Sequence, residues 1–351
     1  MERNRVLVYG ATGYTGKLIS RHAKKIGATP ILAGRDAAKA RALAEPLGLE
    51  HRAAALDDGA ALNAMMQGVA VVLHAAGPFS QTSKKMADAC LRNRCHYLDI
   101  TGEIPVFEAL AARDAEAKAA GVTLLPGVGF DVVPSDCLAA YVAGKLPDAT
   151  KLTLALAGLD NPSRGTAKTA IEGLGMGTAV RRGGRFVTLA TPPRRSFDFG
   201  RGERRCIAIG WGDVSTAWHS TRIPDIEVYF EATRMLSTMS TLGVYGGWLL
   251  RRPAVKSWLK RQVDKQPEGP SDNQRAADRA LILAIAENAV GTKVAARLET
   301  PEGYTLTAQT ALQAATFLAQ GRGQPGFHTP SRLFGADFVM GFEGVRRFDL
   351  N

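Results

Sequence analysis

A glycine triplet near the amino terminus constrains the fold of this 351-residue chain more than any other feature. It lies between a short apolar segment, Arg5–Tyr9, and a segment with helical apolar spacing, Tyr14–Ile26. The pattern is GxxGxxG, formed by Gly10, Ala11, Thr12, Gly13, Tyr14, Thr15 and Gly16. Between a strand and a helix, such glycines allow a sharp turn, a close approach of a diphosphate, and tight helix–strand packing. The sequence therefore predicts a dinucleotide-binding turn, at which backbone N–H groups and the positive helix end hold phosphates; a purely structural turn is the alternative.

The residues that follow alternate between strand and helix signals. Apolar runs typical of strands are Pro30–Ala33, His51–Ala55, Val69–Ala75, His96–Ile100 and Val122–Leu125. Helices are expected between them over Asp36–Leu47, Gly59–Gln67, Thr82–Arg92 and Glu108–Ala120. Repeated βαβ units build parallel sheets with right-handed crossovers. We therefore expect an α/β fold, with a doubly wound Rossmann domain over residues 1–130.

After about Pro147 the pattern changes to strands separated by turns. Strands are expected at Lys151–Ala157, Arg185–Leu189, Arg205–Ile209, Ile226–Ala232, Val294–Glu299 and Tyr304–Ala308. Helices are expected near Thr166–Leu174, Ser237–Val263 and Thr310–Gln320. These signals predict a second, α+β domain with a mixed or antiparallel sheet over residues 131–325, which would bind substrate.

The residue after the second predicted strand selects the nicotinamide cofactor. NAD-binding proteins place Asp or Glu there, where it accepts a hydrogen bond from the ribose 2′-hydroxyl. Here Arg35 follows the strand, with Lys39 one helical turn further on, and the neighbouring Asp36 is expected to cap the next helix. A guanidinium can form paired, charge-assisted hydrogen bonds with a 2′-phosphate. The sequence therefore predicts NADP(H).

Two other segments are expected beside the cofactor. Asp57 or Asp58, after the third strand, would contact the adenine or serve as a solvated turn carboxylate. The fourth strand ends at the expected reversal of strand order, where small residues would let the nicotinamide ribose pass. That segment comprises Ala75, Ala76, Gly77, Pro78 and Phe79.

The substrate is expected at the carboxyl ends of the later strands, because ligands of open α/β sheets bind there. Glu103 follows the fifth strand, and Phe130, Asp131 and Ser135 follow the sixth. These four are the candidate substrate-site residues, although Ser135 and Asp136 would equally well cap the helix Cys137–Lys145. The sequence does not identify a proton donor.

Composition narrows the classes of ligand. Lys and Arg number 44 against 33 Asp and Glu, which gives a formal net charge of +11 and favours anionic ligands. The basic residues are scattered and form no nucleic-acid-binding motif, so a nucleic acid partner is not expected. The four cysteines have neither zinc-site nor disulfide-scaffold spacing. We therefore expect free thiols, no metal and a cytoplasmic location.

One apolar stretch, Met235–Leu250, is followed by the basic residues Arg251, Arg252, Lys256, Lys260 and Arg261. It is shorter than the roughly 20 apolar residues that span a bilayer. A buried or interfacial helix is therefore expected, with peripheral membrane contact as a minor alternative. The stretch also favours a lipid-like or carrier-bound acyl substrate.

With these motifs in view, the chain resembles the saccharopine dehydrogenase-like reductases, in particular the subgroup of trans-acting enoyl reductases. The resembling segments are Gly10–Gly16, Ala75–Phe79, Tyr97–Glu103, Gly129–Asp136, Gly212–Val214, Ile223–Pro224, Pro301–Thr307, Gly326–Ser331 and Gly335–Phe338. The resemblance implies a Rossmann domain, a substrate domain, hydride transfer between them, and a carboxyl-terminal segment, 326–351, that returns toward the interdomain cleft. A competing motif, Tyr141 with Lys145, fits the YxxxK of short-chain dehydrogenases, but also a surface pair on one helix.

These observations together predict an NADPH-dependent oxidoreductase. Hydride transfer to the C=C bond of an enoyl thioester is the first hypothesis. Reduction of a C=N bond, as in saccharopine-type enzymes, is the alternative, and a non-catalytic NADP-binding regulator is a second one. Expected partners are a small-molecule or acyl substrate, an acidic acyl carrier protein and a second copy of the chain in a homodimer.

Overall fold

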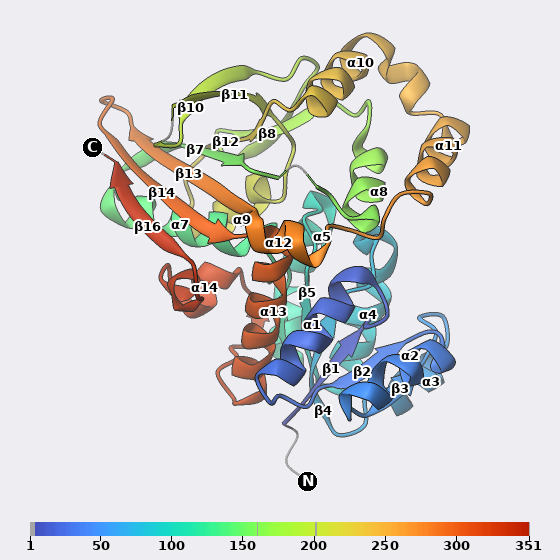
Figure 1. Cartoon of the computed structure of the whole chain (residues 1–351). Coiled ribbons are helices and arrows are strands. Elements are labelled where there is room, and N and C mark those ends of the chain that lie inside the picture. Colours follow the sequence, from blue (N-terminus) through green and yellow to red (C-terminus); the bar gives the residue numbers. More distant parts are fainter. Residues whose placement is uncertain (1–3, 160, 201, 351) are drawn as a thin grey trace. The chain divides into compact units, whose positions relative to one another are not determined.

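The structure, a computed structural model, describes residues 4–159, 161–200 and 202–350. The chain divides into two compact units (Figure 1). The first unit comprises Met1–Val133 and Tyr304–Phe334, and the second comprises Pro134–Gly303 and Gly335–Asn351. The first boundary lies close to the predicted end of the Rossmann domain at residue 130. The other boundaries differ from those expected at 325 and 326, because Tyr304–Phe334 joins the first unit.

The first unit is built on a parallel sheet of seven strands in the order β15-β6-β5-β4-β1-β2-β3. The strands are β1 (Arg5–Tyr9), β2 (Ile31–Gly34), β3 (His51–Ala53), β4 (Val69–His74), β5 (His96–Asp99), β6 (Thr123–Leu125) and β15 (Gly326–Phe327). Because β1 lies between β2 and β4, the order of strands along the chain reverses there. This is the arrangement of a doubly wound Rossmann sheet, and it confirms the predicted fold class.

Helices connect these strands and cover the sheet. They are α1 (Tyr14–Lys25), α2 (Ala37–Ala44), the 3-10 turn η1 (Glu45–Leu47), α3 (Gly59–Met65), α4 (Phe79–Asn93), α5 (Ile104–Ala111) and α6 (Asp114–Ala120). All six residues of β4 are buried, as expected of a strand that is covered on both faces. The predicted helix Glu108–Ala120 is in fact two helices, since the chain breaks at Ala112 and Arg113.

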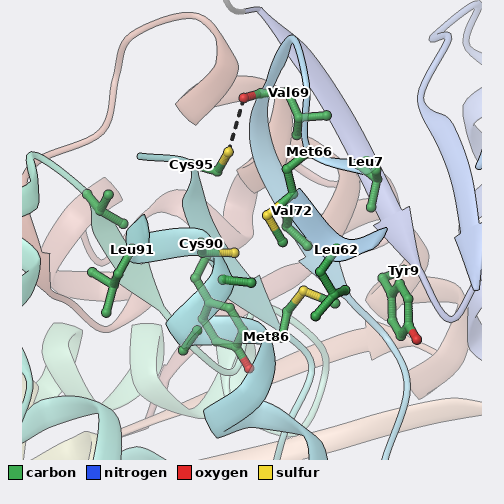
Figure 2. Close-up of a cluster of buried hydrophobic side chains, with 14 of the residues drawn as sticks. Leu7, Tyr9, Leu62, Met66, Val69, Val72, Met86, Cys90, Leu91 and Cys95 are labelled. Atoms are coloured by element: carbon green, nitrogen blue, oxygen red, sulfur yellow. Dashed lines mark hydrogen bonds between the residues drawn. The ribbon is translucent and has the colours of Figure 1, made fainter. Parts of the chain in front are cut away.

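The first unit has a continuous apolar core beneath α3 and α4 (Figure 2). Leu62 of α3 and Met86 and Cys90 of α4 pack with Leu7 of β1 and Val72 of β4 in this cluster. The four cysteines of the chain are free and buried.

Helix α13 (Gly303–Ala319) belongs to the first unit although it comes late in the chain. The prediction of a strand at Tyr304–Ala308 was wrong, since these residues form the first turns of this helix. Tyr and Thr favour strands only weakly on their own, and the packing of the element overrides that preference. After α13 the chain adds β15 to the sheet beside β6, in parallel.

The second unit contains a mixed sheet of nine strands, in which seven follow the order β10-β11-β12-β7-β13-β14-β16 and β8 pairs with β12 and β9. The strands are β7 (Ala149–Ala157), β8 (Thr178–Arg182), β9 (Arg185–Leu189), β10 (Arg194–Asp198), β11 (Glu203–Ala208), β12 (Asp225–Glu231), β13 (Arg279–Asn288), β14 (Lys293–Pro301) and β16 (Arg346–Leu350). In the described part of this sheet, only β7 and β12 pair in parallel. The predicted mixed sheet is confirmed, but the central strand β13 was not foreseen.

The helices of the second unit are α7 (Val133–Lys145), α8 (Arg164–Gly173), α9 (Asp213–Thr221), α10 (Arg234–Leu250), α11 (Pro253–Val263), α12 (Asp272–Ala277) and the 3-10 turn η2 (Phe338–Gly341), and the chain also forms α14 (Pro330–Phe334) at the end of the first unit. The single helix predicted over Ser237–Val263 was wrong. It is split before Pro253, because the residue before a proline avoids the helical conformation and Arg252 is extended. Among the described residues, no helix is long and apolar enough to cross a membrane.

Candidate functional site

The turn between β1 and α1 is held by backbone hydrogen bonds. The N–H groups of Gly10 and Ala11 donate to the carbonyl of Ala33 at 2.8 and 3.1 Å, and Gly13 N donates to the carbonyl of Gly10 at 3.0 Å. Gly10 has a φ of +86°, and a Cβ there would lie 2.8 Å from the backbone of Ala75. The turn out of β1 therefore requires glycine at this position.

The other two glycines of the turn have different surroundings. A Cβ on Gly16 would lie 2.3 Å from the carbonyl oxygen of Gly10, so this residue must be glycine for α1 to meet the turn. A Cβ on Gly13 would come no closer than 3.4 Å to the chain. Gly13 precedes α1, whose first turn carries no acidic residue. The chain thus leaves the space beside Gly13 open, at a positively polarised helix end, which fits the diphosphate of a dinucleotide.

Arg35 lies directly after β2 and is exposed to solvent. The carboxylate of Asp36 accepts a hydrogen bond from Lys39 N at 3.1 Å and caps α2, as the sequence predicted. Asp36 is therefore engaged with the helix, and Arg35 offers its guanidinium to the solvent at the carboxyl end of β2. This placement fits a 2′-phosphate better than a 2′-hydroxyl.

Asp57 is also exposed, and its carboxylate forms an ion pair with Lys85 of α4. The neighbouring Asp58 caps α3 by accepting a hydrogen bond from Ala61 N at 2.9 Å. Both carboxylates that sequence reasoning offered for the adenine are exposed, but Asp58 is engaged in capping a helix, whereas Asp57 pairs only with a flexible lysine side chain in the interactions described. Its contact with the adenine stays a prediction.

The loop Ala75–Phe79 follows β4 and leads into α4. Both carboxylate oxygens of Glu103 accept hydrogen bonds at the start of α4, from Phe79 N at 2.8 Å and Ser80 N at 3.0 Å. A carboxylate is stabilised at this end of a helix. Glu103 therefore positions the loop beside the cofactor turn, which favours a structural role for this predicted substrate-site residue.

Sequence reasoning missed two side chains that shape the same loop. Thr82 donates from its hydroxyl to the carbonyl of Ala76 at 2.8 Å, and His74 Nε2 lies 3.0 Å from that hydroxyl. Burial lowers the pKa of His74 to about 3, so the imidazole is neutral. The sequence signal that could have identified His74 is its position as a polar residue at the end of an otherwise apolar strand.

Asp99, at the end of β5, ties two strand ends together. Its carboxylate accepts hydrogen bonds from the hydroxyl of Tyr97 at 2.7 Å, from Thr101 N at 3.0 Å and from Gly127 N at 2.9 Å. Desolvation by burial raises the pKa of Asp99 to about 6. The side chain fixes the segment after β6, on which Phe130 and Asp131 lie.

The segment after β6 is fixed from its other side by α13. Phe130 N donates to the hydroxyl of Thr307 at 2.9 Å, and the hydroxyl of Thr310 donates to the carbonyl of Val128 at 2.8 Å. Phe130 is buried, and Asp131 is half-buried. Desolvation raises the pKa of Asp131 to about 7, so the carboxyl group is close to half protonated at neutral pH. Such a group can donate a hydrogen bond or a proton.

Ser135 lies in the second unit and is fully buried. Its hydroxyl donates to Asp213 Oδ1 of α9 at 2.7 Å, and the next residue, Asp136, accepts a hydrogen bond from Ser220. These contacts join α7 to α9. They favour a structural role for Ser135, and its proposed contact with substrate stays a prediction.

The competing pair, Tyr141 and Lys145, contacts Asp349 of the carboxyl-terminal strand β16. Lys145 Nζ lies 2.7 Å from Asp349 Oδ2, and the hydroxyl of Tyr141 donates to the same carboxylate at 3.0 Å. The guanidinium of Arg347 lies 3.5 Å from the centre of the Tyr141 ring. This cluster fastens β16 to α7, which favours the interpretation of Tyr141 and Lys145 as a surface pair.

In the first unit, the predicted cofactor and substrate segments therefore meet at one edge of the sheet. The segments Gly10–Gly16, Ala75–Phe79 and Phe130–Asp131 all follow the carboxyl ends of parallel strands. No cluster of potential metal ligands is found among the described residues. The strand order and the turn at its reversal point define the class: a Rossmann-type dinucleotide-binding unit.

Comparison with known proteins identifies this unit further. Residues 6–125 match the family model of the saccharopine dehydrogenase NADP binding domain. Over these residues the chain is similar to that family, as the sequence motifs indicated, and the match confirms the predicted cofactor, NADP(H).

Curated relatives match a little over a third of the chain. A protein of Mycobacterium leprae named trans-acting enoyl reductase is 32% identical over 139 residues, which are 37% of this chain and 33% of that protein. A putative trans-acting enoyl reductase of Mycobacterium tuberculosis is 32% identical over 159 residues, or 42% of this chain and 38% of the relative. The alignments thus span about a third of the length of these relatives.

The fold as a whole has a relative among solved structures. Apo saccharopine dehydrogenase (L-Glu forming) from Saccharomyces cerevisiae superposes with a TM-score of 0.67 over 99% of this chain and 100% of that one, at 14% identity. At this identity the similarity concerns the fold, which it confirms in both units.

Proposed function

We propose that this protein is an NADPH-dependent reductase that transfers hydride to the C=C bond of an enoyl thioester. The observation that carries the proposal is the turn Gly10–Gly16, which leaves room for a diphosphate within a domain of an NADP-binding family. The choice of acceptor is supported by the relatives named trans-acting enoyl reductases, to which part of the chain is 32% identical.

In this proposal the chain divides the binding of NADPH among four segments. The turn at Gly13 and the start of α1 bind the diphosphate, Arg35 binds the 2′-phosphate, and Asp57 borders the adenine. The loop Ala75–Phe79, fixed by Glu103 and Thr82, passes beside the nicotinamide ribose. Bound NADPH supplies the hydride, and the protein orients it and excludes competing reactions.

We further propose that Asp131 assists the reduction. Hydride addition to the β-carbon of an enoyl thioester leaves an enolate, whose oxygen needs a hydrogen-bond donor before the α-carbon is protonated. Asp131 has a pKa of about 7 and lies on the segment after β6, at the edge of the sheet where β1 meets the cofactor turn. Its protonated form can therefore donate a hydrogen bond to the enolate oxygen and then transfer its proton to the enolate. Asp131 is the residue that we assign to this role, while Phe130 would line the acceptor site.

The substrate is proposed to arrive on an acyl carrier. The formal net charge of +11 would attract the acidic surface of a carrier protein. The four reduced, buried cysteines suit a cytoplasmic protein, which is where we propose that it acts. A homodimer is also proposed, on the general prevalence of twofold assemblies among soluble enzymes.

The proposal is tested by following NADPH oxidation with two acceptor classes. One is a 2-enoyl thioester of pantetheine, and the other is an imine formed from an α-keto acid and an amine. We expect oxidation with the thioester and, when the cofactor carries deuteride, deuterium at the β-carbon of the saturated product. Turnover with the imine alone would instead identify a saccharopine-type reductase. Tight NADPH binding with no turnover in either assay would identify a non-catalytic regulator.

A further inference from the structure

We propose that helices α10 and α11 dock on an anionic lipid surface. The docking surface comprises the apolar residues Met235, Leu242, Trp248 and Trp258 together with Arg251, Arg252 and Arg261. We call it the α10–α11 surface. It lies in the second unit and involves none of the residues assigned above to the binding of NADPH (Figure 1).

The α10–α11 surface exposes large apolar side chains. Of the ten large hydrophobic side chains that are exposed in the described part of the chain, four lie on these two helices: Met235 at 58%, Leu242 at 54%, Trp248 at 63% and Trp258 at 53%. Among the described side chains of α10, the exposed positions are 234, 235, 238, 241, 242 and 248, and at 3.6 residues per turn all of them lie on one side of the helix. Soluble proteins seldom expose such groups together unless they bind something there.

The other sides of the two helices are already packed. A Cβ on Gly175 would lie 2.6 Å from the carbonyl oxygen of Gly247, so α10 runs directly against the loop that follows α8. Helix α11 contacts α8, where Lys256 and Lys260 form ion pairs with Glu172. Both helices are therefore seated on the second unit, and their exposed faces are fixed in place.

Charge defines what this surface attracts. Between Glu231 and Asp264 the sequence contains six basic residues and no Asp or Glu. Glu172 offsets the two lysines, whereas Arg251, Arg252 and Arg261 are exposed. The guanidinium of Arg252 lies 4.9 Å from the centre of the Trp248 ring. The α10–α11 surface therefore combines apolar groups with an excess of positive charge.

This combination fits the interface of an anionic membrane. Tryptophan is favoured at the level of the lipid headgroups, where its ring is buried and its N–H stays hydrated. Arginine beside it pairs with lipid phosphates, and Met and Leu enter the boundary of the acyl chains. A fluid lipid surface also accepts side chains that project from helices without requiring a complementary pocket. The helices would thus lie on the membrane and not cross it.

The experiment measures sedimentation of the full chain with vesicles of phosphatidylcholine alone or mixed with phosphatidylglycerol. We expect binding to the mixed vesicles, weakened by salt, together with a blue shift of tryptophan emission. The double variants Trp248→Ala/Trp258→Ala and Arg251→Glu/Arg252→Glu should each reduce binding at least about tenfold. The matched control is Arg21→Glu/Lys25→Glu, which changes the net charge equally on exposed positions of α1 and should bind as the unchanged protein does.

Retained NADPH binding shows that the first unit of each variant has folded, and an unchanged circular dichroism spectrum and thermal unfolding transition show the same for the second unit. The proposal is overturned if the unchanged protein does not bind the mixed vesicles. It is also overturned if the control variant Arg21→Glu/Lys25→Glu loses as much vesicle binding as Arg251→Glu/Arg252→Glu does. Two other occupants give different results. If a second copy of the chain occupies the surface, the protein will be a dimer in solution and will not bind vesicles. The variant Trp248→Ala/Trp258→Ala will then be a monomer. An acidic carrier protein would bind to the same surface while the vesicles do not.

Discussion

We propose that a single exposed guanidinium, that of Arg35, sets the preference of this protein for NADPH over NADH. Arg35 follows β2 and lies at the surface, and Asp36, the carboxylate next to it, is engaged in capping α2. Neither side chain belongs to the core, so each can be replaced with little effect on the fold. The choice of cofactor can therefore be tested separately from stability.

Arg35→Ala is expected to weaken the binding of NADPH by about tenfold or more and to leave that of NADH nearly unchanged. A hydrogen bond to a charged group contributes roughly 1.5–3 kcal/mol, and the 2′-phosphate is present only in NADPH. Calorimetric titration with both dinucleotides measures the two effects. Arg21→Ala, an exposed arginine on α1, is the control. Equal losses for NADPH and NADH would contradict the role of Arg35.

Asp131 should make stability depend on pH in a definite direction. Its folded-state pKa of about 7 lies above the ordinary value of 3.8, so the folded protein holds a proton that the unfolded chain has released. Stability is therefore lost as the pH rises from about 4 to 7. Asp131→Asn removes this titration. As the pH rises through that range, we expect the free energy of unfolding of the variant to increase by about 2 kcal/mol relative to that of the unchanged protein.

Urea unfolding at pH 4.5 and pH 7.5 checks the expectation for Asp131. A difference between the two proteins that is the same at both pH values would exclude a perturbed carboxyl group. In the enzymatic assay the same variant should lower kcat more than it raises KM, because a neutral amide donates a hydrogen bond but cannot deliver a proton.

At the scale of elements, the site depends on how closely α1 approaches the turn after β1. Gly16 is the contact point, since a Cβ there would overlap the carbonyl oxygen of Gly10. Gly59, at the start of α3, has nothing within 4 Å of such a Cβ and also begins a helix. The two glycines therefore form a matched pair for testing whether helix packing shapes the turn.

Gly16→Ala is expected to destabilise the protein by about 2 kcal/mol and to weaken NADPH binding by more than tenfold, because the helix must move away from the turn. Gly59→Ala should be neutral or slightly stabilising, since alanine has the higher helix propensity. Thermal unfolding and NADPH titration of both variants provide the measurement. Similar behaviour of the two would show that the α1 contact is dispensable.

At the scale of the whole molecule, the first unit is assembled from two distant parts of the chain. Helix α13 supplies the hydroxyls that hold Val128 and Phe130, and β15 extends the sheet beside β6. Nine of the residues of α13 are buried: Leu306, Thr307, Ala308, Thr310, Ala311, Leu312, Ala314, Ala315 and Leu318. The Rossmann unit is therefore incomplete without them.

A fragment of residues 1–133 is accordingly expected to be poorly folded and to bind NADPH weakly. Joining residues 304–334 to it through a flexible linker should restore a cooperative unfolding transition and NADPH binding. Circular dichroism on heating, with and without NADPH, makes the comparison. Should the short fragment unfold as cooperatively as the joined one, α13 would be an accessory and not a part of the core.

The sequence by itself determined the cofactor domain and its chemistry. The strand Arg5–Tyr9, the glycines that follow it and the cap at Asp36 depend on local backbone geometry, which neighbouring residues dictate. Such features carry their own signals: apolar runs, spaced glycines and capping side chains. For the same reason the class of cofactor could be predicted from one residue, Arg35, which follows the second strand.

Tertiary structure alone decided the rest. Helix α13 and strand β15 join the first unit, Glu103 caps α4, and Ser135 bonds to Asp213. The bonds from Phe79 to Glu103, from Ser135 to Asp213 and from Phe130 to Thr307 connect residues 24, 78 and 177 positions apart. No local pattern encodes such contacts, because burial and hydrogen bonding between distant segments depend on which surfaces the folded chain brings together. The same reason explains the perturbed pKa of Asp131, which desolvation in the folded protein creates.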